Sequence, residues 1–124
     1  MKPKVLIIED EPTSLKLTQV VLEAEGYTVR DVNSAEEALE AITQRRPEFI
    51  IMDLKLPGMS GLDLTRKLKN NPATRDIPVV AVTFYPSQFK REEALAAGCD
   101  AYFIKPIDTR GLPKTIAEVA SKKE

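Results

Sequence analysis

Short apolar runs alternate with amphipathic stretches along the whole chain. The run Phe49-Ile50-Ile51-Met52 is apolar without interruption, which is typical of a strand buried on both faces of a parallel sheet. Four other runs also have strand length. The five predicted strands cover residues 4–8, 27–32, 49–53, 77–83 and 101–104.

Helix signals separate these strands. Thr13 and Ser14 are predicted to cap the first helix, and Gly26 to end it. Ser34 is predicted to cap the second helix, with Glu37 three residues later completing a capping box. A helix is also expected after each of the remaining strands. This alternation predicts an α/β fold: a doubly wound, five-stranded parallel sheet with five helices on both faces.

The composition of the chain argues against several classes of function. The chain has 124 residues, of which 43% are hydrophobic and 30% charged, so we expect one globular domain over residues 1–124. A net charge of −1 gives no electrostatic case for direct nucleic-acid binding. The apolar runs are strand-sized, so neither a membrane span nor a signal-peptide core is predicted, and a cytoplasmic protein is the expectation.

The chain contains no histidine. This excludes Ser-His-Asp and Cys-His catalysis, most zinc sites, and a role for the chain as a phosphohistidine carrier. The one cysteine, Cys99, lies among small and apolar residues and is expected to be buried and unreactive.

Polar residues recur at the carboxyl ends of the predicted strands. Glu9 and Asp10 follow the first strand, Asp53 ends the third, Thr83 ends the fourth and Lys105 follows the fifth. In the doubly wound strand order 2-1-3-4-5, these ends line one edge of the sheet, and the first and third strands flank the crevice where such sheets bind ligands. The sequence therefore predicts one site from five residues that lie far apart in the chain.

The charges of this site indicate its chemistry. Close carboxylates repel one another, and their hard oxygen atoms suit Mg²⁺, which also binds phosphate oxygens. Asp53 beside Mg²⁺ and Lys105 would be an activated nucleophile towards a phosphoryl donor, because both cations stabilise the transferring group. Thr83 could donate a hydrogen bond to the acyl phosphate, and a shift of its loop would change the protein surface.

Four segments, each following its strand, resemble the receiver domain of bacterial two-component response regulators, a CheY-like domain with the flavodoxin-like fold. The resemblance extends over essentially the whole chain, and the order of the four motifs makes it specific. The segments are Val5–Glu11, Ile51–Gly61, Pro78–Thr83 and Gly98–Pro106.

The resemblance implies a role for each residue of the site. Asp53 would be the phosphoacceptor, Asp10 the acid closest to Mg²⁺, and Glu9 an acid that acts on the metal mainly through water. Asp53 itself and the backbone carbonyl of Lys55 would complete the protein ligands. Lys105 would bind the phosphoryl group.

The resemblance also implies the parts of a switch. Thr83 would be the switch hydroxyl, and Tyr102 the switch aromatic that rotates inward on activation. Pro106 would follow Lys105 through a cis peptide bond. The protein would take a phosphoryl group from a sensor histidine kinase or a histidine phosphotransfer protein, and would signal to a downstream protein. It would catalyse only its own phosphorylation and dephosphorylation, and so is not expected to be an enzyme with a separate substrate.

One residue departs from the family pattern. The position after the switch hydroxyl is usually small, whereas here it is Phe84, followed by Tyr85 and Pro86. We expect Phe84 either to swing outward or to cover Asp53 in part, as an access gate that slows exchange with donors and water. Lys55 and Tyr85 together could lengthen the phosphorylated lifetime.

Three alternatives stay open. A degenerate receiver that is never phosphorylated would serve as a protein-binding scaffold, and Phe84 is the feature in its favour. A phosphatase with an aspartyl nucleophile usually carries a second aspartate two residues later, where this chain has Lys55. A nucleotide-binding protein would need a glycine-rich phosphate loop after a strand, and no strand here is followed by one.

Overall fold

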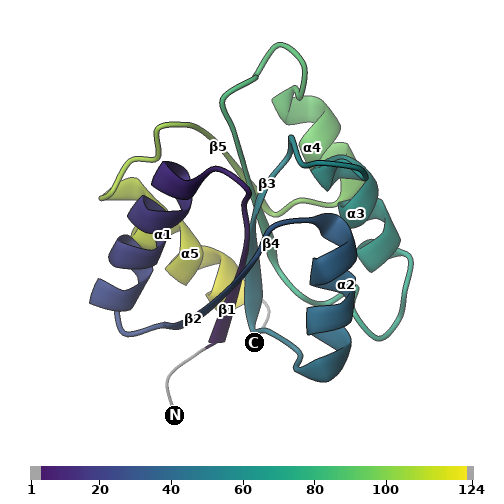
Figure 1. Cartoon of the computed structure of the whole chain (residues 1–124), viewed down its shortest axis with the longest axis horizontal. Helices are drawn as coiled ribbons and strands as arrows, with labels where there is room; N and C mark the ends of the chain where they lie inside the picture. The colour runs from purple at the N-terminus through teal and green to yellow at the C-terminus, as the bar shows by residue number, and fades with distance from the viewer. Residues whose placement is uncertain (1–3, 123–124) are drawn as a thin grey trace.

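The computed structural model describes residues 4–122, in which strands and helices alternate throughout (Figure 1). The elements are β1 (Lys4–Ile8), α1 (Pro12–Ala24), β2 (Thr28–Val32), α2 (Ala35–Gln44), β3 (Phe49–Asp53), α3 (Gly61–Lys69), β4 (Val79–Thr83), α4 (Arg91–Ala97), β5 (Ala101–Ile104) and α5 (Gly111–Lys122). The predicted bounds of β1, β3 and β5 are confirmed. β2 and β4 begin one and two residues later than expected.

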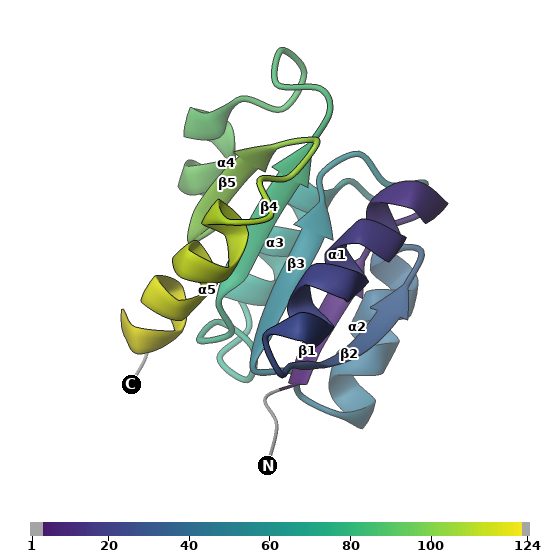
Figure 2. The ribbon, with the colours of Figure 1, turned by 90° about the vertical axis from the view of Figure 1, so that its left-hand side faces the viewer.

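All neighbouring strands run parallel, in the order β2-β1-β3-β4-β5. This confirms the predicted doubly wound sheet. The register pairs Ile8 with Met52 and Asp53 with Val82, so the carboxyl ends of the central strands lie level with one another. Figure 2 shows the strands ending along one edge of the sheet. The residues that follow β1, β3, β4 and β5 therefore meet at that edge.

Helices cover both faces of the sheet. Figure 1 places α1 and α5 on one face and α2, α3 and α4 on the other. One core cluster packs under α2, α3 and α4, and a second packs under α1 and α5. β3 and β4 are buried along their whole length. Each fully buried aliphatic side chain contributes about 2 kcal/mol, and this stabilisation offsets the cost of burying charge at the strand ends.

The start of α1 corrects the prediction for its cap. Thr13 and Ser14 do not cap the helix. The carboxylate of Glu11 does, accepting hydrogen bonds from the backbone N–H groups of both residues at 3.1 and 2.6 Å. Pro12 occupies the first turn, where its missing N–H group costs nothing. These bonds lower the pKa of the Glu11 carboxyl, so it carries a negative charge at the helix start.

The cap of α2 is confirmed in part. The hydroxyl of Ser34 accepts a hydrogen bond from the backbone N–H of Glu37 at 3.1 Å. The carboxylate of Glu37 binds the backbone N–H of Asn33 at 2.7 Å, one residue before the expected partner. Gly26 follows α1 with φ of 91°, as expected for a glycine that ends a helix. Within residues 4–122, no helix is both long and apolar enough to cross a bilayer.

Candidate functional site

The structure brings the predicted polar residues together at the carboxyl edge of the sheet. Glu9 directly follows β1, Asp53 is the last residue of β3, and Thr83 is the last residue of β4. Lys105 follows β5, and its ammonium group lies 3.0 Å from a carboxylate oxygen of Asp53. Because β1 and β3 are neighbours in the sheet, the acids after them share the crevice at the switch point of the fold.

Three carboxylates form the acidic part of the site. Oxygen atoms of Glu9, Asp10 and Asp53 all lie within 4.8 Å of one another. Glu9 is 3% exposed and Asp53 is 7% exposed, whereas Asp10 is exposed to solvent. Two carboxylates sit in a dry environment and the third faces water, so a cation could enter from the side of Asp10.

Backbone groups hold the two buried acids in place. The N–H of Lys55 donates to Oδ1 of Asp53 at 3.0 Å, and the N–H of Glu11 donates to Oε2 of Glu9 at 3.2 Å. Each bond uses one carboxylate oxygen and leaves the other to face Lys105. The segments after β1 and β3 therefore fix how both acids point.

Lys105 supplies the counter-charge. Its ammonium group is buried and donates hydrogen bonds to Oδ2 of Asp53 at 3.0 Å and to Oε1 of Glu9. A buried ion pair gives little net stability, but removing one partner leaves an uncompensated charge and costs several kcal/mol, about 3 to 5. The Lys105–Pro106 peptide bond is cis, as the resemblance implied.

The protonation of Glu9 reflects this crowding. The pKa of Glu9 is raised to about 7, chiefly because burial disfavours the charged carboxylate; the hydrogen bond with Asp53 adds to this rise, and the contact with Lys105 opposes it. Near neutral pH, a proton on Glu9 therefore relieves the repulsion between the buried carboxylates. A divalent cation among these oxygens would relieve it as well, and would displace the proton.

The donor set fits Mg²⁺. The available side-chain ligands are all carboxylate oxygens, drawn from Glu9, Asp10 and Asp53, and neither histidine nor thiolate is nearby to favour a softer metal. The exposed position of Asp10 also suits a metal that keeps several water ligands. The contribution of the Lys55 carbonyl stays a prediction.

Thr83 closes the site beside β3. It is fully buried, and its Oγ1 accepts a hydrogen bond from the backbone N–H of Tyr85 at 2.9 Å. Because the oxygen is the acceptor in this bond, the hydroxyl keeps its own proton to donate to another group. Thr83 is therefore tied to the first residues of the β4–α4 loop.

Comparison with known proteins agrees with this arrangement. The family model described as the response regulator receiver domain matches residues 5–117. The chain belongs to this family. Receiver domains of two-component systems are signalling modules rather than conventional enzymes, and they interact with histidine kinases and downstream targets.

Individual relatives cover nearly the whole receiver domain. The polar-differentiation response regulator DivK of Brucella anthropi is 38% identical over 116 residues, which is 94% of each chain. A CheY-like receiver domain of Methanospirillum hungatei superimposes with a TM-score of 0.89 at 32% identity, covering 99% of this chain and 97% of that one. The receiver domain of the Pseudomonas aeruginosa sensor histidine kinase PA1611 has a TM-score of 0.88 at 27% identity, covering 98% and 99%. That structure is described with magnesium in its active-site cleft.

The β4–α4 loop of this receiver domain places two aromatic rings beside the site. The Phe84 ring centroid lies 5.0 Å from the Lys105 ammonium, and the Tyr85 centroid lies 4.2 Å from the Lys55 ammonium. Phe84 is 48% exposed and Tyr85 is 47% exposed. The Phe84 ring therefore lies next to the Lys105 ammonium, and about half of its side chain remains exposed to solvent.

Tyr102 lies on β5, which β4 separates from the strand that ends at Asp53. Its side chain is buried, and its hydroxyl donates to the backbone carbonyl of Phe89 at 2.5 Å. The guanidinium of Arg91 lies 5.9 Å from its ring. The sequence pointed to Tyr102 but not to Phe89 or Arg91, because contacts with a loop carbonyl and a helix start leave no periodic signal.

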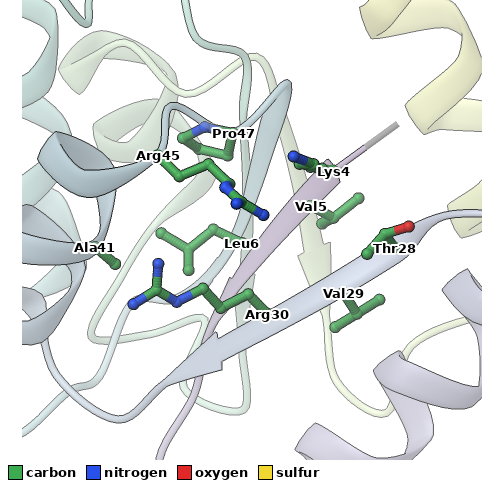
Figure 3. Close-up of a pocket in the computed structure, with 9 residues that line it drawn as sticks. All are labelled: Lys4, Val5, Leu6, Thr28, Val29, Arg30, Ala41, Arg45 and Pro47. Atoms are coloured by element: carbon green, nitrogen blue, oxygen red, sulfur yellow. The ribbon is translucent and has the colours of Figure 1, made fainter. Parts of the chain in front are cut away.

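A cavity lies at the amino end of the sheet, opposite the acids (Figure 3). Its volume is about 80 Å³, and it lies between β1, β2 and the end of α2. Lys4, Arg30 and Arg45 surround a wall that includes Leu6. This receiver domain therefore carries acids at one end of the sheet and bases at the other.

Proposed function

We propose that this receiver domain accepts a phosphoryl group on Asp53 from the phosphohistidine of a sensor kinase or a histidine phosphotransfer protein. The observation that carries the proposal is the buried contact between Asp53 and Lys105 at 3.0 Å, next to two further carboxylates. A surface aspartate has no such neighbours. The domain would span residues 1–124.

In the proposed reaction, a carboxylate oxygen of Asp53 attacks phosphorus. The phosphorus–nitrogen bond of the donor breaks as the new phosphorus–oxygen bond forms, and the electron pair leaves with the imidazole nitrogen. The Lys105 ammonium, already within hydrogen-bond distance of Asp53, would stay beside the new phosphoryl oxygens and balance their charge. The protein turns over no separate substrate.

Mg²⁺ would be held by Glu9, Asp10, Asp53 and the backbone carbonyl of Lys55. When bound, it would add positive charge beside the phosphoryl oxygens. Support for this ligand set comes from the 4.8 Å cluster of acidic oxygens, and from the similar receiver domain that is described with magnesium in its active-site cleft.

The signal would pass through Thr83. Its hydroxyl proton would be donated to a phosphoryl oxygen on Asp53, and the hydroxyl would move towards that group. The bond from the Tyr85 N–H would then stretch or break, and the β4–α4 loop would shift. Tyr102 would respond as the switch aromatic, so the face formed by α4 and β5 would present the phosphorylated state to a downstream protein.

Mass spectrometry tests the proposal. The natural protein, Asp53→Ala and a control with an exposed aspartate removed, Asp76→Ala, would each be incubated with acetyl phosphate and Mg²⁺. We expect one phosphoryl adduct on the natural protein and on Asp76→Ala, and none on Asp53→Ala. An adduct that persists in Asp53→Ala would contradict the assignment.

The alternative is a scaffold that is never phosphorylated, and it rests on Phe84 at the mouth of the site. Beryllofluoride separates the two functions, because it mimics a phosphoryl group on a carboxylate and needs no donor. If the natural protein neither gains an adduct nor binds beryllofluoride with Mg²⁺, the scaffold function would be favoured.

A further inference from the structure

A cavity of about 470 Å³ opens beside the acid cluster. It lies between the first turns of α1, the start of the β4–α4 loop and the segment after β5. Its apolar lining includes Leu17, Phe84, Tyr85 and Ile107, and Lys105 lies in its wall. The group that contacts Asp53 therefore also borders a partly apolar space open to solvent.

Phe84 holds a defined place in this cavity. Its ring centroid is 5.0 Å from the Lys105 ammonium, and that ammonium is 3.0 Å from Asp53. A cation over the ring face favours this position through the quadrupole of the ring. Yet the side chain is 48% exposed, so part of the ring remains free to pack against a molecule that enters the cavity.

Because Lys105 both lines this cavity and contacts Asp53, the leaving group of a donor to Asp53 would come within reach of the cavity. The leaving group of a phosphohistidine is imidazole, a planar aromatic ring, and aromatic rings pack against one another with centroids about 4.5 to 7 Å apart. Acetyl phosphate and phosphoramidate carry small leaving groups without a ring. An aromatic ring beside Lys105 would therefore distinguish the two kinds of donor.

We propose that Phe84 is a specificity-determining residue on which the imidazole of the phosphoryl donor packs. This inference rests on the proposed function, since it concerns the donor to Asp53. It differs from the access gate expected from the sequence, in which Phe84 slows every donor alike. Packing lowers the barrier for ring-bearing donors and leaves the others unchanged.

Three donors separate packing from gating. Initial rates of phosphorylation would be measured by intact mass with N-phosphoimidazole, phosphoramidate and acetyl phosphate, all with Mg²⁺. The proteins are the natural chain, Phe84→Ala, Phe84→Leu and Phe84→Tyr. Leu95→Ala removes an apolar side chain of similar exposure on α4, 43% against 48% for Phe84, and serves as the matched control. Thermal unfolding of each variant checks the fold, which an exposed side chain should not perturb.

We expect Phe84→Ala and Phe84→Leu to lower the rate with N-phosphoimidazole about three- to tenfold, the usual worth of one aromatic pair. Rates with phosphoramidate and acetyl phosphate should stay the same or rise. Phe84→Tyr should keep the preference of the natural chain, and Leu95→Ala should change no rate.

Other patterns would overturn the inference. If Phe84→Ala raises the rates with all three donors equally, Phe84 acts as a gate. If it lowers all three rates equally, Phe84 acts by positioning Lys105. If Leu preserves the preference as well as Tyr does, an aromatic ring is not required. If the natural protein takes a phosphoryl group from none of the donors, the proposed function fails, and this inference fails with it.

Discussion

Charged side chains gather at both ends of the sheet, but they differ in burial and in their contacts. At the carboxyl end, Glu9, Asp53 and Lys105 are buried and joined by hydrogen bonds. At the amino end, Arg30 and Arg45 are exposed around the cavity of Figure 3, and Arg30 donates to the Gln44 side chain at 3.0 Å. In the described part of the chain, neither arginine forms an ion pair.

This difference distinguishes a functional site from an ordinary charged surface. Burying ions is costly, so a buried cluster with opposite charges in contact indicates a role beyond stability. Exposed arginines lay their aliphatic stems over apolar surface and keep their charges in water. The comparison therefore predicts large effects of substitution at the carboxyl end and small effects at the amino end.

The largest effect should follow Lys105→Ala. This change leaves Asp53 and Glu9 buried without a counter-charge, so we expect the free energy of unfolding to fall by about 3 kcal/mol at pH 8. Urea denaturation in EDTA would measure the loss. A loss below about 0.5 kcal/mol, the level of an ordinary surface substitution, would show that the buried contacts of Lys105 contribute no more than those of an exposed side chain.

The pH dependence of stability should come next. Glu9 has a folded pKa of about 7, above its unfolded value of 4.5, so the folded state binds the extra proton between these pH values. Its contribution to stability is therefore present below pH 4.5 and is lost as the pH rises through about 7, by up to about 3 kcal/mol. Denaturation of the metal-free protein at several pH values measures this slope.

Glu9→Gln supplies the control, because the amide cannot titrate. Between pH 5 and about 7, the free energy of unfolding of the variant should fall much less than that of the natural protein. An unchanged slope in the variant would assign the effect to other groups and remove one distinction between the two ends of the sheet.

Mg²⁺ should stabilise the carboxyl end by a smaller amount. At a concentration ten times its dissociation constant, a ligand that binds only the folded state adds about 1.4 kcal/mol. Thermal unfolding with and without Mg²⁺ should show this gain in the natural protein and in Asp76→Ala, and no gain in Asp10→Ala. An equal gain in all three would mean that Mg²⁺ binds elsewhere.

The smallest effect should follow Arg45→Ala at the amino end. Since the side chain is exposed and forms no ion pair within residues 4–122, stability should change by less than about 0.5 kcal/mol. The initial rate of phosphorylation should match that of the natural protein. A large drop in either quantity would show that the amino end of the sheet also carries a functional site.

Much of the fold and the set of site residues could be predicted from the sequence. Apolar runs set β1, β3 and β5, and the rule that parallel strands end at one edge brought Asp53 and Lys105 together. The cap of α1 was missed because Glu11 accepts two backbone N–H groups through a side chain that the usual preferences rank below serine and threonine.

Side-chain orientation could not be predicted in the same way. Whether Phe84 covers the acids or stands beside them depends on its contact with Lys105, and the two residues come from different loops. The link between Tyr85 and Lys55 likewise joins segments that are far apart in the chain. Such contacts depend on three-dimensional packing and leave no pattern along the sequence.

Trapping with borohydride would locate the phosphoryl group in the chain. Borohydride reduces an acyl phosphate to an alcohol, so a phosphorylated aspartate becomes homoserine and can be located by peptide mass spectrometry. After treatment with a phosphoryl donor and Mg²⁺, we expect homoserine at position 53 alone. Homoserine at another aspartate, or a phosphorylated protein with Asp53 unmodified, would contradict it.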